Sequence, residues 1–113
     1  MQPNPASSDA FPIEHKEMEA GGEFIIQKDG ERIAELTYGL SPKKVMSIDH
    51  TWVRPDLRAQ GIARKLVDAS VQWARSAGVR VRPVCSYARV VLSRDKSAAD
   101  ILVQSAMPLR EGR

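Results

Sequence analysis

The chain has 113 residues, 42% hydrophobic and 27% charged, which suits one domain with a modest core and argues against wholesale disorder. A net charge of only +3, spread along the sequence, disfavours a dedicated nucleic-acid binder, and the single cysteine excludes an intrachain disulfide. The sequence shows neither a signal peptide nor an apolar stretch of about 20 residues, so we expect a cytoplasmic protein without a membrane span.

The first 22 residues mix Pro, Ser, Asn and Gly with short charged runs, which predicts a loosely ordered segment. From residue 23 the pattern becomes regular. Residues 24–28 are rich in strand-forming side chains, Asp29-Gly30 is a strong hairpin signal, and residues 32–38 alternate between apolar and polar. These features predict two antiparallel strands joined by a tight turn.

Residues 45–53 predict a third strand, which Pro55-Asp56 would end. Strict alternation would place four of its side chains on one face: Met46, Ile48, His50 and Trp52. A helix is expected from about Gly61 to Ala77, because its apolar residues recur at helical spacing. Gly78 follows at the position typical of a C-terminal glycine cap.

Residues 79–84 predict a fourth strand that ends near Pro83, and Ser86 is expected to cap a second helix. Residues 97–107 are expected to hold a further short helix, and residues 108–113 a flexible tail. The predicted order is therefore β-β-β-α-β-α. Three antiparallel strands and one parallel strand, reached through a helical crossover, make an α+β sheet with helices packed on it.

The start of the predicted helix at Gly61 has the features of an anion-binding site. The first turn of a helix leaves backbone N–H groups unpaired, and these groups attract anions together with the helix dipole. Glycine lets a phosphate approach the backbone, and Arg58, Arg64 and Lys65 add positive charge. A pyrophosphate would suit this loop, although a glycine that merely turns the chain into a helix gives the same signal. The patterns G-x-G-x-x-G and G-x-x-x-x-G-K-[ST] are absent.

Three segments are more specific together than each is alone: His50-Thr51-Trp52-Val53, then Arg58-x-x-Gly61-x-Ala63, then Cys85-Ser86-Tyr87. In this order they resemble the GNAT superfamily of N-acetyltransferases, in which R/Q-x-x-G-x-G/A joins a strand to a helix. A closer resemblance is to its short members with a single such motif, which share an H-T-x-V strand end, the glycine loop and a C-S-Y segment. The resemblance covers about residues 23–94.

The resemblance implies a reduced GNAT fold over residues 23–107, with acetyl-CoA as acyl donor in a split between the third and fourth strands and an amine as acceptor. It implies that the backbone around Trp52 and Val53 pairs with the pantetheine arm. The pyrophosphate site would comprise Arg58, Ala59, Gln60, Gly61, Ile62, Ala63 and Arg64. The implied function is an acetyl-CoA-dependent N-acetyltransferase. The alternative is a non-catalytic CoA-binding or protein-interaction module, because the link 39–44 is too short for the helices that shape the acceptor site in full-length members.

Three side chains are candidates for the chemistry. Cys85 precedes a predicted helix, where a thiolate is stabilised; it could carry the acyl group as a thioester, line the site during direct transfer, or be an inert buried cysteine. His50 could accept the amine proton or be a structural histidine within the sheet. By the resemblance Tyr87 could protonate the CoA thiolate, or it could pack as a helix-face aromatic. One cysteine and two distant histidines make no metal-ligand set.

Overall fold

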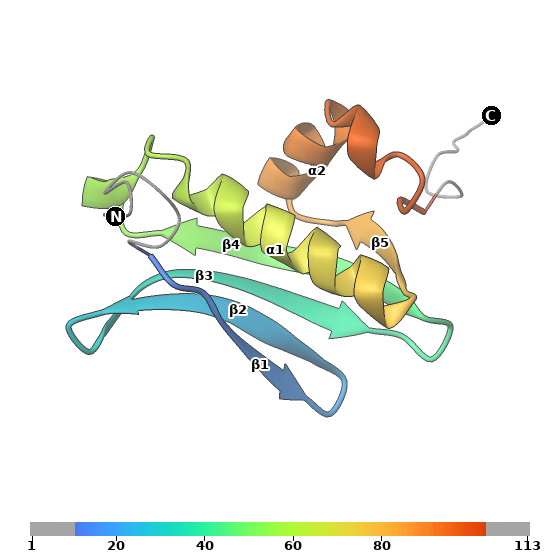
Figure 1. The fold of residues 1–113 in the computed structure, drawn as a ribbon, viewed down its shortest axis with the longest axis horizontal. Coiled ribbons are helices and arrows are strands. Elements are labelled where there is room, and N and C mark those ends of the chain that lie inside the picture. Colours follow the sequence, from blue (N-terminus) through green and yellow to red (C-terminus); the bar gives the residue numbers. More distant parts are fainter. Residues whose placement is uncertain (1–10, 104–113) are drawn as a thin grey trace, which may run out of the picture.

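A five-stranded sheet forms the centre of the structure, a computed structural model that describes residues 11–103. Its strands lie side by side in chain order: β1 (Glu14–Met18), β2 (Gly21–Lys28), β3 (Glu31–Leu40), β4 (Val45–Val53) and β5 (Arg80–Pro83). The strands β1 to β4 are antiparallel, whereas β5 runs parallel to β4 after a crossover through α1 (Ile62–Ala77), which Figure 1 shows lying across the sheet. The predicted α+β class and mainly antiparallel sheet are confirmed.

The strand β1 occupies a stretch for which the sequence predicts only loose order. It is an edge strand with mostly exposed side chains, so it carries little of the apolar alternation that reveals a strand. Its side chain His15 points inward, stacks on Phe24 with ring centroids 4.1 Å apart, and shares a 2.6 Å hydrogen bond with the Tyr38 hydroxyl. Trp73 of α1 packs edge-on against the same imidazole. These aromatic contacts fasten β1 to the sheet.

Other predicted elements fall near their expected places. The Asp29-Gly30 turn has positive φ at both residues, as the tightest hairpin turns require. The expected third helix is reduced to a 3-10 turn, Lys96–Ala98, within the described chain. Residues 1–10, 104–107 and the predicted tail 108–113 lie outside the described residues. None of the helices described is long and apolar enough to span a membrane.

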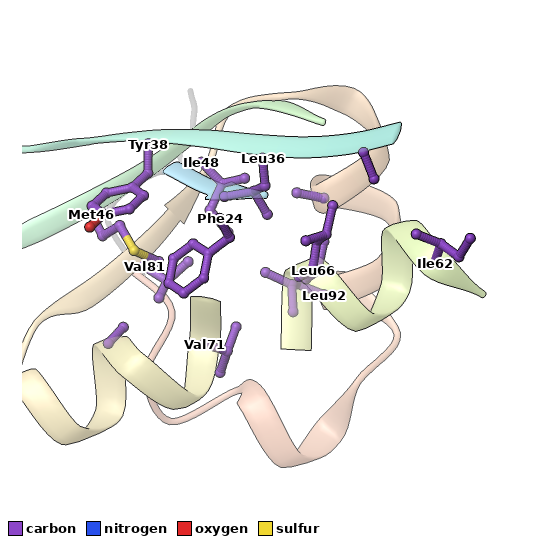
Figure 2. Packing of buried hydrophobic residues seen from close by; sticks show 14 of the residues in the cluster. Phe24, Leu36, Tyr38, Met46, Ile48, Ile62, Leu66, Val71, Val81 and Leu92 are labelled. Atoms are coloured by element: carbon purple, nitrogen blue, oxygen red, sulfur yellow. The ribbon is translucent and has the colours of Figure 1, made fainter. Parts of the chain in front are cut away.

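The core lies between one face of the sheet and the two α-helices. Figure 2 shows side chains of the strands, including Phe24, Leu36 and Ile48, near Leu66 and Val71 of α1. The second helix, α2 (Ser86–Ser93), adds two buried residues to the same cluster, Ala88 and Leu92. Both helices therefore cover the same face, which we call the helix face; we call the other the open face.

An irregularity in β4 changes which of its side chains meet the core. In the register with β3, Thr37 pairs with His50, but the next residue, Tyr38, pairs with Ile48. Asp49 is therefore an extra residue opposite this step, a β-bulge. Such a residue interrupts the strict alternation of side chains along a strand.

The bulge overturns the prediction that His50 and Trp52 share a face with the buried Met46 and Ile48. Beyond Asp49, Thr51 pairs with a core residue of β3 and turns toward the helix face, whereas His50 and Trp52 lie on the open face opposite Thr37 and Glu35. The side chain of His50 is accordingly 51% exposed.

Candidate functional site

The parallel pair β4–β5 separates part of the way along. Paired residues run only from Val45–Arg80 to Ile48–Pro83. At the point of separation the carbonyl oxygen of Ile48 accepts the backbone N–H groups of both Val84 and Cys85, each at 3.0 Å. Beyond Ile48, no strand within residues 11–103 pairs with this edge of β4. The backbone there is free to bond with something else.

The loop after β4 closes the far end of this separation. Its 3-10 turn, Pro55–Leu57, is followed by Arg58, whose Nε donates to the carbonyl oxygen of Val53 at 2.8 Å. Ala59 has φ 66° and Gly61 φ 78°, both in the left-handed region that glycine adopts without strain. Two left-handed residues within three positions give the loop the sharp path that leads into α1.

Gly61 is the N-cap of α1, and it contributes no side-chain hydrogen bond to the helix. The N–H of Lys65 bonds to the Gly61 carbonyl at 3.1 Å, so the N–H groups of Ile62, Ala63 and Arg64 precede the first α-helical hydrogen bond. A Cβ placed on Gly61 would meet no atom within 4 Å, so there is open space beside the helix terminus. Free N–H groups, the helix dipole and open space together suit an anion.

A hollow of about 360 Å³ joins the free edge of β4 to this helix terminus. It is lined by Thr51, Trp52, Val53, Leu57, Arg58, Ala59, Gly61, Ile62, Ala63 and Tyr87. Most of the residues expected at an acyl-CoA site thus lie around one hollow, but Gln60 and Arg64 do not line it. Sequence reasoning missed Thr51 and Leu57; the signal for Thr51 was obscured by the bulge.

Arg64 carries a charge that protein carboxylates already engage. Its guanidinium contacts Asp68 at 3.0 Å and Asp95 at 3.3 Å, an arrangement that ties the first turn of α1 to the chain after α2. The positive potential near the hollow therefore rests more on backbone N–H groups than on this side chain.

Tyr87, in the first turn of α2, lines the hollow and is 38% exposed. Burial raises the pKa of its hydroxyl, an effect that nearby Arg64 offsets in part. A raised pKa keeps the phenol protonated at neutral pH, which is the form able to donate a proton.

Cys85 lies behind the hollow. It, not the predicted Ser86, is the N-cap of α2: its Sγ accepts the N–H of Ala88 at 3.4 Å. A thiol sulfur can accept a hydrogen bond, and Cys85 has the extended backbone that an N-cap needs. The same Sγ lies 3.7 Å from Thr51 Oγ1 on the helix face. Thr51 therefore connects this half-buried thiol to the hollow.

His50 stands on the other side of β4. Its Nε2 lies 3.2 Å from Oε2 of Glu35 on the open face, whereas Cys85 packs against the core on the helix face. The structure thus does not bring the two predicted catalytic groups together. Among residues 11–103, no group of three or more His, Cys, Asp or Glu side chains is placed to hold a metal ion.

Comparisons with a family model and with solved structures agree on one family. Residues 23–101 match the model of a family described as GCN5-related N-acetyl-transferase. Among solved structures, a GCN5-like protein from Staphylococcus aureus is 32% identical with a TM-score of 0.63, and the match covers 80% of this chain and 87% of that one. A search of curated proteins found no match.

Two further structures share the fold over a smaller part of their length. The ribosomal-protein-S18-alanine N-acetyltransferase from Escherichia coli has 20% identity and a TM-score of 0.52, over 57% of this chain and 42% of the enzyme. A Bacillus anthracis protein solved in complex with acetyl coenzyme A has 15% identity and a TM-score of 0.50, over 57% of this chain and 37% of that one. At these identities the likeness concerns the fold alone.

Proposed function

Because the chain belongs to the GCN5-related N-acetyltransferase family, whose members use acetyl-CoA as cosubstrate, we propose that it transfers the acetyl group of acetyl-CoA to an amine. The observation that carries the proposal is the single hollow that joins a free strand edge to a helix N-terminus. A strand edge suits an amide-bearing arm, and a helix N-terminus suits a pyrophosphate.

The N-terminus of α1 would bind the pyrophosphate. The N–H groups of Ile62, Ala63 and Arg64 have no partner within the helix, and Gly61 keeps the approach to them open. Arg58, held against the Val53 carbonyl, fixes the loop that leads to these donors. The guanidinium of Arg58 would therefore act more by shaping the loop than by meeting the phosphates directly.

The free edge of β4 would bind the pantetheine arm. It extends from the Ile48 carbonyl, which the N–H groups of Val84 and Cys85 occupy, to the Val53 carbonyl, which Arg58 occupies. Between these two points, backbone groups on this edge have no strand partner within the described residues. An arm with amide groups would supply the hydrogen bonds that a neighbouring strand would otherwise make.

The chemistry is attack of a neutral amine nitrogen on the thioester carbonyl carbon, with departure of the CoA thiolate. Tyr87, which keeps its proton at neutral pH, would donate to that thiolate. Two roles are open to Cys85. In one, its thiol takes the acetyl group as a thioester before the amine does; in the other, it only supports Thr51 while the amine attacks acetyl-CoA directly. His50 would accept the proton that the amine loses.

Binding and turnover are tested separately. Addition of acetyl-CoA to ¹⁵N-labelled protein should shift the backbone amide signals of Ile62, Ala63 and Arg64, whereas a short oligonucleotide should not. Release of free CoA thiol is then measured with spermidine, tyramine and a lysine-containing peptide as acceptors. Absence of amide shifts at millimolar acetyl-CoA would contradict the proposal. Amide shifts without thiol release from any amine would instead favour the alternative, a CoA-binding module without catalysis.

A further inference from the structure

A row of charged side chains crosses the open face beside the point where β4 and β5 separate. Arg32 Nη1 lies 3.0 Å from Oε1 of Glu23 and 3.0 Å from Oε1 of Glu35, and its Nη2 lies 3.2 Å from Oε2 of Glu23. The other carboxylate oxygen of Glu35 lies 3.2 Å from Nε2 of His50. The row Glu23–Arg32–Glu35–His50 thus joins three strands and ends at His50.

Each member of the row limits the movement of the next. Arg32 occupies one oxygen of Glu35, so the second oxygen is the one directed at His50. The Glu35 side chain is only 24% exposed, which restricts its rotamers, whereas the His50 side chain is 51% exposed and accessible to solvent. Glu35 is therefore a restricted carboxylate beside a more exposed imidazole.

A carboxylate at this distance selects one form of the neutral imidazole. If Nε2 were unprotonated, its lone pair would face an anionic oxygen at 3.2 Å, which is repulsive; with the proton on Nε2 the contact is attractive. The lone pair is then on Nδ1, the nitrogen that faces away from Glu35.

The charged groups around His50 come from its own strand and from the neighbouring strands. On the open face its register partner is Thr37, on β3, and the charged groups nearby are those of the row on β2 and β3. Asp49 precedes it in β4, and Arg82 of β5 lies on the same face opposite Ser47, at the last part of the strand pair before the separation. Among these groups Glu35 is the one in contact with the imidazole.

We infer that Glu35 is a positioning residue that holds His50 with Nδ1 as the proton acceptor. Because His50 lies on the open face, the acceptor amine would reach the thioester from that face. The inference rests on the proposed function. In the step, the amine nitrogen forms a bond to the acetyl carbon, the carbon–sulfur bond breaks with its electron pair on sulfur, and one amine proton moves to Nδ1 of His50. The imidazolium later returns that proton to solvent, and the thiolate is protonated to CoA.

The first test needs no acceptor. Imidazole ¹⁵N shifts of the labelled full chain are recorded at pH 8 in the wild type, in Glu35→Gln and in Glu31→Gln. Glu31 is the matched control, because it is a carboxylate on the same strand that contacts Arg54 at 2.9 Å and no histidine. We expect His50 to be protonated at Nε2 in the wild type and in the control. In Glu35→Gln the two nitrogen shifts should move toward those of a free imidazole. Unchanged His50 shifts in Glu35→Gln would overturn the inference.

The second test separates positioning from a general structural effect by a double-mutant cycle. With the best of the three amines, His50→Ala should slow thiol release about 100-fold, the scale of a lost general base, and Glu35→Gln about tenfold or more. In the His50→Ala background, Glu35→Gln should have no further effect, because Glu35 acts through the imidazole. An equal slowing in both backgrounds would show that Glu35 only supports the sheet. If no amine is turned over, the proposed function fails its own test, and the nitrogen shifts still decide the role of Glu35.

Discussion

Two glycines at the ends of α1 allow a controlled test of the proposed acetyl-CoA site. Gly61 has φ 78° and Gly78 has φ 75°, and a Cβ on either would meet no atom within 4 Å. Alanine is therefore strained to the same degree at both positions, without a clash at either. The left-handed conformation costs a non-glycine residue roughly 1–2 kcal/mol, and alanine's smaller unfolded-state entropy offsets about 0.4–1 kcal/mol of this. We expect each variant to lose about 1 kcal/mol of stability.

That loss corresponds to a fall in Tm of roughly 4 °C for a chain of this length, because the entropy of unfolding is about 2.1 cal/mol/K per residue. Acetyl-CoA affinity should differ between the variants. Only at Gly61 does the new methyl group enter the space where the pyrophosphate would approach the helix N–H groups. Loss of one hydrogen bond to a charged group costs about 1.5–3 kcal/mol, which weakens binding at least tenfold.

The assay is calorimetric titration with acetyl-CoA, preceded by thermal melting of both variants. Gly61→Ala should bind at least tenfold more weakly than the wild type, and Gly78→Ala should bind as the wild type does. If Gly61→Ala binds normally, or if both variants lose affinity equally, the assignment of the pyrophosphate to the start of α1 is refuted.

Three further changes have defined outcomes. Ala59→Gly relieves a positive φ of 66° and should raise the free energy of unfolding by up to about 1 kcal/mol, measured by urea titration; a loss of stability would contradict the strain argument. Burial, partly offset by Glu17, lowers the pKa of His15 from 6.5, so that as the pH falls this imidazole is protonated in the unfolded chain before it is protonated in the folded chain. Tm should therefore fall from pH 7.5 to pH 5, and in His15→Phe this decline should shrink. Incubation with acetyl-CoA should add one acetyl group at Cys85 by intact mass if the thioester route operates, whereas no adduct together with full activity in Cys85→Ala would exclude that route.

The sequence allowed the fold class to be predicted because its strongest signals are local. The helical spacing of apolar residues over α1 and the glycines at both its ends depend on neighbours a few residues apart, and the structure confirms both. The strand β1 escaped prediction because its stability comes from distant partners: His15 is held by Phe24, Tyr38 and Trp73, which belong to three other elements.

The loop of the candidate site could be predicted from the sequence, but the face of the sheet to which each side chain of β4 points could not. The bounds of β4 follow from its composition, but nothing in the residues Ser47 to Thr51 shows where the alternation slips. The slip is decided by pairing with β3, at Thr37 and Tyr38. Likewise, the cap of α2 falls on Cys85 and not on Ser86, because β5 ends in two N–H bonds to Ile48 that fix where the helix begins.

The bulge at Asp49 also bears on how this chain tolerates changes of length. It lies directly after Ile48, the last residue of β4 that pairs with β5, and bulges increase the local twist of a strand. Removal of Asp49 would restore an uninterrupted alternation without exchanging the faces of His50 and Thr51. The extra twist after Ile48 would then be lost, while β5 would still end at Pro83 and lead into α2. A single-codon deletion of Asp49 should therefore leave the hydrophobic pattern of β4 intact and change the direction of the strand beside the hollow.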